Sequence, residues 1–117
     1  MEKDNKNLVH RFYEEVGNTG NIGRIEEFIS KGYTEVFNGI RHQVGIEGAT
    51  ARIMGVRQTY PDLHITIDSQ IAEEEWVVTC ITARGTHLGT WLGIKPTGKK
   101  VTITGVNVDR VVGGADR

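Results

Sequence analysis

Two long runs rich in valine, isoleucine and threonine dominate the second half of the chain, at Trp76–His87 and Val101–Val112. β-Branched residues favour extended backbone, because their side chains pack well on a pleated surface. A third segment, Leu63–Ile71, alternates apolar and polar residues, which is typical of a strand with one buried face. Together these segments predict a sheet of long antiparallel strands.

The first half of the chain instead shows helical periodicity. We expect a first helix from about Asp4 to Gly17, a second short helix closing near Gly32, and a third from about Ile46 to Tyr60. The apolar stripes of these helices share a spacing of three or four residues and are Leu8, Val9, Phe12, Tyr13 and Val16; Ile22, Ile25, Phe28 and Ile29; and Ile46, Ala49, Ile53, Met54 and Tyr60. Helices followed by antiparallel strands predict an α+β domain, with the helices covering one face of the sheet.

Composition limits the class of protein. The 117 residues are 38% hydrophobic and 25% charged, as in one ordinary globular domain. The formal charge of -1 gives no sign of nucleic-acid or membrane binding. A single cysteine, Cys80, excludes an internal disulfide and a cysteine-based zinc site. The polar start lacks a signal core, and no apolar run approaches the roughly 20 residues that span a bilayer. We therefore expect a cytoplasmic protein.

Strand alternation identifies the candidate chemical groups. In Trp76–His87, the smaller apolar side chains share a face with His87, so we assign that face to the concave side of the sheet. In Val101–Val112, Asn107 and Asp109 share a face. A histidine that faces an aspartate in an apolar pocket is a plausible acid–base pair. The alternatives remain open: His87 as a satisfied polar residue at a strand end, and Asp109 in a salt bridge.

No spacing in the chain indicates a metal or a phosphate. No two histidines have the helical separation of a metal site. The segment Thr97–Lys100 looks like part of a phosphate loop, but it lacks the upstream glycine and the following helix. We therefore expect no metal site.

Three segments give the chain a family resemblance, with matching order and spacing over roughly residues 6 to 114. They are Gly45-Ile46-Glu47-Gly48, Thr59-Tyr60-Pro61-Asp62-Leu63, and the stretch from Gly85-Thr86-His87-Leu88-Gly89 through Leu92-Gly93-Ile94-Lys95-Pro96-Thr97-Gly98-Lys99-Lys100-Val101. The first segment is similar to the entry into a family's third helix, and the second to the exit from that helix. The third segment is similar to the most specific signature of the same family. The chain resembles the SnoaL-like polyketide cyclases, which have the α+β fold named after nuclear transport factor two.

The resemblance implies a cone-shaped, curved antiparallel sheet with three N-terminal helices packed on its concave face. It implies a homodimer or small homo-oligomer that binds a small hydrophobic, polyketide-like ligand. The implied reaction is an intramolecular aldol condensation of a polyketide ester, without metal or organic cofactor. In that case His87 and Asp109 would act as acid and base, and Asn107 would donate to the oxyanion. Tyr13, Asn38 and Trp91 would line the pocket. For Tyr13 and Asn38 the favoured alternatives are core packing and a simple turn, and for Trp91 the alternative is a cap on the apolar mouth.

Two departures from the family pattern stand out. The position of the family's catalytic histidine falls on Asn107, and an amide cannot shuttle a proton. The family's aspartate lies on a final strand, whereas this single domain reaches Val112 and ends with Gly113–Arg117. We expect that strand to be absent or shortened, with a partner chain covering the open edge. An omission between Val112 and Gly113 would also explain the ending.

Other functions on the same fold remain open. The substitution at Asn107 and the missing acid favour a non-catalytic small-molecule-binding protein. An isomerase or epoxide hydrolase is a third alternative, because one fold hosts several chemistries. A subunit with only an assembly role is a fourth.

Overall fold

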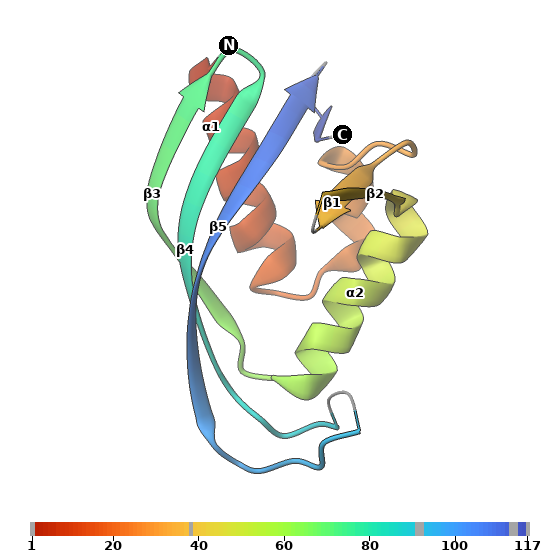
Figure 1. Ribbon diagram of the computed structural model, residues 1–117, viewed down its shortest axis with the longest axis vertical. Coiled ribbons are helices and arrows are strands. Elements are labelled where there is room, and N and C mark those ends of the chain that lie inside the picture. The colour runs from red at the N-terminus through yellow and green to blue at the C-terminus, as the bar shows by residue number, and fades with distance from the viewer. Residues whose placement is uncertain (1, 38, 91–92, 113–114, 117) are drawn as a thin grey trace.

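The chain folds into helices in its first half and long strands in its second, as the sequence predicts. A computed structural model describes residues 2–37, 39–90, 93–112 and 115–116 (Figure 1). Two α-helices, α1 (Glu2–Phe12) and α2 (Gly45–Thr59), precede the three long strands. The strands are β3 (His64–Glu73), β4 (Trp76–Thr86) and β5 (Lys100–Val112). The predicted α+β class is therefore confirmed.

The helices differ from the prediction in length and type. The first helix ends in a π-turn, η1 (Tyr13–Gly17), which is closed by an Asn18 N–H donating to the carbonyl of Tyr13 at 2.8 Å. The predicted second helix is a six-residue 3₁₀ segment, η2 (Ile22–Glu27). So short a segment offers too few α-helical hydrogen bonds to offset nucleation. The expectation of three N-terminal helices is thus met only in part.

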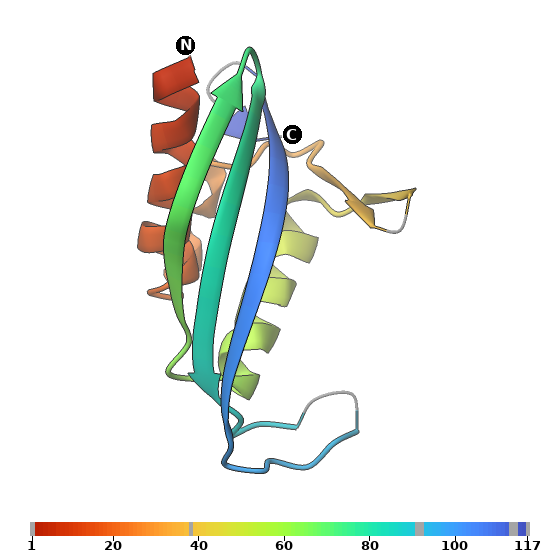
Figure 2. The ribbon, with the colours of Figure 1, turned by 60° about the vertical axis from the view of Figure 1, so that its left-hand side comes forward.

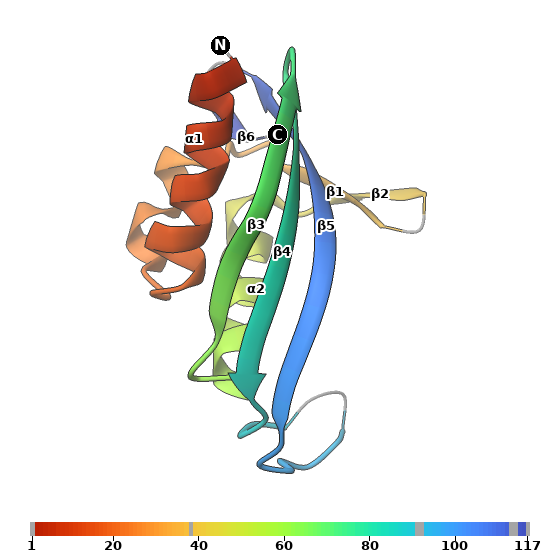
Figure 3. The same ribbon diagram turned by 90° about the vertical axis from the view of Figure 1, so that its left-hand side faces the viewer.

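An antiparallel sheet in the order β3-β4-β5-β6 forms one layer of the molecule. Strand β4 pairs along its whole length with β5 on one side and over Trp76–Arg84 with β3 on the other. The last strand, β6 (Ala115–Asp116), pairs only with Val111 and Val112. The sheet is curved and open, and the helices lie on its concave side (Figures 1 and 3).

A separate hairpin lies on the β5 side of the sheet (Figures 1 and 2). Strand β1 (Thr34–Phe37) pairs antiparallel with β2 (Ile40–Gln43), which no sequence pattern predicted. All four residues of β2 are exposed, so the strand carries no alternation that would have predicted it. The hairpin projects from the body of the molecule (Figure 2).

Two apolar clusters hold these layers together. The first joins the end of α1, η2 and α2, and its members are nearly inaccessible: Val16, Ile25, Phe28, Ile29 and Ala49. The second joins α1 to the inner face of the sheet and contains Val9, Tyr13, Val77 and Val111. Phe12 connects the clusters through edge contacts with Phe28 at 5.8 Å and Tyr13 at 6.1 Å between ring centroids. This packing fixes the helices over the sheet at the place where the candidate site forms.

Candidate functional site

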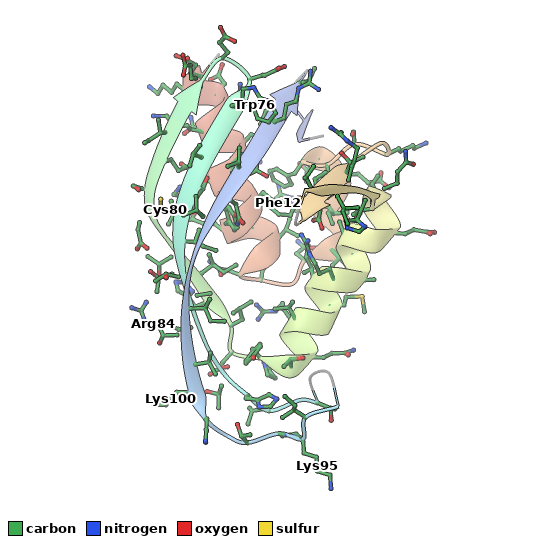
Figure 4. All side chains as sticks on the ribbon, in the orientation of Figure 1. Phe12, Trp76, Cys80, Arg84, Lys95 and Lys100 are labelled. Atoms are coloured by element: carbon green, nitrogen blue, oxygen red, sulfur yellow. The ribbon has the colours of Figure 1, made fainter. Side chains whose placement is uncertain are left out.

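A cavity of about 860 Å³ lies among α1, the β1–β2 hairpin, α2 and β5. Its apolar and aromatic lining residues are Leu8, Val9, Phe12, Tyr13, Phe28, Tyr33, Val36, Trp76, Val106 and Val108. Its polar and charged lining residues are Thr34, Glu35, Arg41, Arg52, Asn107, Asp109 and Arg110. Phe12 lies on the side of α1 that faces the hairpin (Figure 4). The cavity thus combines an apolar wall with several polar and charged groups, and such a combination can bind and orient a small molecule.

Three of the sequence-predicted residues meet in this cavity: Tyr13, Asn107 and Asp109. In the sheet register, Asn107 lies opposite Thr79, and Asp109 lies opposite Val77. Thr79 and Val77 are fully buried, so this is the inner face of the sheet. Asn107 and Asp109 are two residues apart on one strand, which places their side chains about 7 Å apart.

The π-turn helps to place Tyr13, because it begins at this residue. The Tyr13 ring is buried between α1 and the sheet, and its hydroxyl accepts a hydrogen bond from Asn107 Nδ2. Single π-turns within helices are frequent at functional sites, because they change the direction in which side chains project. Tyr13 therefore both packs in the core and lines the cavity.

Ion pairs organise the charged part of the cavity wall. Glu35 pairs with Arg52 of α2, and it also accepts a hydrogen bond from the Tyr33 hydroxyl at 2.8 Å. Arg110 pairs with Glu75 across 3.1 Å. No sequence pattern predicted this network, because Glu35 and Arg52 are 17 residues apart in the chain and neither belongs to a motif.

His87 does not meet Asp109, so the predicted facing pair is wrong. Asp109 lies opposite Val77, which precedes His87 by ten residues on the same chain segment. Because a strand rises about 3.3 Å per residue, Asp109 and His87 are about 30 Å apart. His87 is instead buried at the opposite end of the sheet, and its Nδ1 shares a hydrogen bond with Thr97 Oγ1 at 3.0 Å. Alternation predicted the face of His87 correctly, but it carries no information on distance along the strand.

The surroundings of His87 connect the strands to α2. Its ring packs against Tyr60, with 5.8 Å between ring centroids. The backbone N–H groups of Leu88 and Gly89 both donate to the carbonyl of Thr59. Nearby, the hydroxyl and the N–H of Thr86 both donate to Asp62 at 2.7 Å and lower the pKa of that carboxyl. These contacts anchor the link after β4 to the end of α2.

The remaining predicted residues lie outside the described part of the chain. Asn38 and Trp91 belong to this group, so their predicted role in lining the pocket stays a prediction. Within residues 2–37, 39–90, 93–112 and 115–116, no group of three or more His, Cys, Asp or Glu side chains has the geometry to hold a metal ion. Across the same residues, no helix is long and apolar enough to cross a membrane.

Comparison with known proteins gives a family match over nearly the whole chain. The model of the SnoaL-like polyketide cyclase family matches residues 7–115. No curated protein matches the chain.

Several solved structures have the same fold. A candidate SnoaL-like polyketide cyclase from Jannaschia sp. CCS1 is 24% identical, with a TM-score of 0.88 over 99% of this chain and 82% of that one. A candidate polyketide cyclase from Acidithiobacillus ferrooxidans is 24% identical, with a TM-score of 0.84 over 97% and 82%. AclR, a candidate hydroxylase from Streptomyces galilaeus, is 24% identical, with a TM-score of 0.88 over 99% and 75%.

Proposed function

Because the chain belongs to the SnoaL-like polyketide cyclase family, we propose that it closes a ring on a polyketide ester by an intramolecular aldol condensation. The observation that carries the proposal is the meeting of Tyr13, Asn107 and Asp109 in one cavity that has both apolar and polar walls. Such a cavity binds the folded carbon chain and brings its two reacting carbons together. Holding them in position can supply several kcal/mol of the barrier.

Asp109 is the acid–base group of the proposed reaction. Its carboxylate takes a proton from a carbon next to a carbonyl, and the resulting enolate attacks a second carbonyl of the same chain. The new carbon–carbon bond leaves an alkoxide, which takes the proton back from the Asp109 carboxyl. No atom is lost and no electrons are transferred, so the reaction needs neither an oxidant nor an organic cofactor.

Asn107 and Tyr13 stabilise the developing oxyanion in this proposal. One N–H of the Asn107 amide donates to the Tyr13 hydroxyl, and the amide carries a second N–H donor. Donors that are already oriented toward a developing negative charge are typically worth several kcal/mol. His87 has no part in the proposal, because it lies at the far end of β4.

A non-catalytic small-molecule-binding protein is the second candidate. Asn107 favours it, because an amide stands at the position of the family's catalytic histidine and cannot transfer protons. The two candidates share the cavity but differ in turnover.

Ring closure of an anthracycline-type polyketide methyl ester, followed by liquid chromatography, separates the two candidates. We expect the wild type to form the cyclised product, Asp109→Asn to lose at least about a hundredfold in rate, and Arg84→Gln to keep full activity. Arg84 is a suitable control because it is exposed and points away from the helices (Figure 4). Binding without turnover by the wild type would establish the binding protein, and full activity of Asp109→Asn would remove Asp109 from the mechanism.

We also propose that the protein is a cytoplasmic homodimer. The cytoplasmic location is supported by the use of a single cysteine. The dimer is supported by three exposed side chains, Ile71, Val106 and Val108, on the outer face of the sheet. Val106 and Val108 also border the cavity, because β5 lies along its edge. A large exposed apolar patch is typical of an interface. Light scattering should give twice the 13.0 kDa chain mass for the wild type and a monomer for Val108→Lys; a monomeric wild type would contradict the proposal.

A further inference from the structure

Arg41 differs from the other cations of the cavity wall. Arg52 pairs with Glu35, and Arg110 pairs with Glu75. Within the described residues, the guanidinium of Arg41 has no carboxylate partner; its Nη1 donates only to the hydroxyl of Thr34, at 3.4 Å. Among the residues that the structure describes, Arg41 is therefore a cation of the cavity wall without a counter-ion.

The neighbouring carboxylate cannot easily neutralise Arg41. Glu35 lies on the adjacent strand of the hairpin, but it is held by Arg52 and by the Tyr33 hydroxyl. To pair with Arg41, Glu35 would have to give up both contacts. Hydrogen bonds to a charged group are worth more than neutral ones, so the existing arrangement is favoured.

The hairpin presents Arg41 to the cavity together with apolar surface. Arg41 lies directly opposite Val36 in the β1–β2 register, and both line the cavity with Thr34. Directly opposed residues of an antiparallel pair project from the same face of the sheet. The guanidinium thus borders an apolar wall, which is the arrangement that an amphipathic anion requires.

We propose that Arg41 binds the acidic group of an amphipathic organic anion whose apolar body fills the cavity. This inference rests on the proposed function in that the cavity must hold the ligand, and it adds that the ligand carries, besides the ester, a carboxylate or a similar oxyanion. A guanidinium matches the two oxygens of such a group with parallel N–H donors. The Asp109 carboxylate repels the same group from β5, so the two charges orient the ligand with its acidic end at the hairpin and its uncharged end at Asp109.

Two fluorescent probes with one ring skeleton test the inference. 1-Anilinonaphthalene-8-sulfonate carries a negative charge, and N-phenyl-1-naphthylamine does not. We expect Arg41→Gln to weaken sulfonate binding about three- to tenfold and to leave the neutral probe unchanged. Arg84→Gln removes the same charge from the exposed outer face and should change neither affinity. Added salt should weaken sulfonate binding to the wild type more than to Arg41→Gln.

Three results would overturn the anion site. They are equal sulfonate affinity in the wild type and Arg41→Gln, an equal loss of both probes in Arg41→Gln, and no binding of either probe by the wild type. Turnover is measured separately. An enzyme that cyclises a neutral ester but binds both probes without using Arg41 refutes this inference alone, and an Arg41-dependent binder without turnover refutes only the cyclase.

Discussion

Replacing Gly89 by alanine tests how tightly the link after β4 packs on α2. A Cβ added at Gly89 would lie 2.4 Å from the carbonyl oxygen of Gln58 and 2.9 Å from the Cα of Thr59. Both are backbone atoms, and ordinary contacts of this kind are about 3.5 Å, so the two segments must separate by about 1 Å. No flexible side chain is present to absorb the added methyl group.

The expected loss of stability follows from two contributions. Overpacking of this kind costs about 1–3 kcal/mol. The separation also lengthens two hydrogen bonds to the Thr59 carbonyl, from Leu88 at 2.9 Å and from Gly89 at 3.1 Å, each worth about 0.5–1.5 kcal/mol. We expect Gly89→Ala to lower the free energy of unfolding by about 2–4 kcal/mol. In a chain of this size, that lowers Tm by roughly 8–16 °C.

Gly55 provides a matched control with the opposite sign. It lies within α2, and a Cβ added there meets nothing within 4 Å. Gly55→Ala should raise stability by about 0.5–1 kcal/mol, because alanine has the higher helix propensity. Both variants are compared with the wild type by urea and thermal unfolding, followed by circular dichroism. A Gly89→Ala protein as stable as the wild type would refute the packing argument.

Two further predictions concern side chains that bond the backbone of the sheet. Asn18 accepts from the Ile65 N–H at 2.6 Å and donates to its carbonyl at 3.0 Å, so Asn18→Ala should cost about 1–3 kcal/mol in urea unfolding. Asn21 is exposed, so Asn21→Ala should leave the free energy of unfolding almost unchanged. Equal losses of stability in the two variants would contradict the role of the Asn18 hydrogen bonds. The pKa of Asp62 is lowered by hydrogen bonds from Thr86. The ionised Asp62 carboxylate therefore stabilises the folded state. This stabilisation is fully present above the unfolded pKa of about 3.9 and is lost as pH falls through the lower folded pKa. The difference in Tm between the wild type and Asp62→Asn should therefore shrink between about pH 5 and pH 2, and a constant difference would contradict it.

Local patterns in the sequence predicted the elements better than their arrangement. Alternation identified the three long strands and the shared face of Asn107 and Asp109, because it depends only on which side chains are buried. It could not place His87, because distance along the sheet depends on the register of whole strands. The strand β2 was not predicted, since all of its residues are exposed.

The family signature has a physical reading that the sequence alone did not provide. Gly85 and Gly89 flank His87, and a Cβ at either position would press on Tyr60 or on the last turn of α2. These glycines therefore mark the close approach of two segments rather than a catalytic loop. The Glu35–Arg52 pair could not be predicted, because it joins a hairpin and a helix that only the tertiary fold brings together.

The unequal covering of β4 and β5 has a consequence for how the cavity wall moves. Strand β4 lies between two partners, whereas in the described chain β6 covers the far side of β5 only at Val111 and Val112. Amide protons of β4 should exchange with solvent only when the whole domain opens, and those on the uncovered side of β5 should exchange much earlier. The segment Val106–Arg110 forms part of the cavity wall. This wall can therefore yield to ligands of different width while the packing of α1 on β4 stays intact.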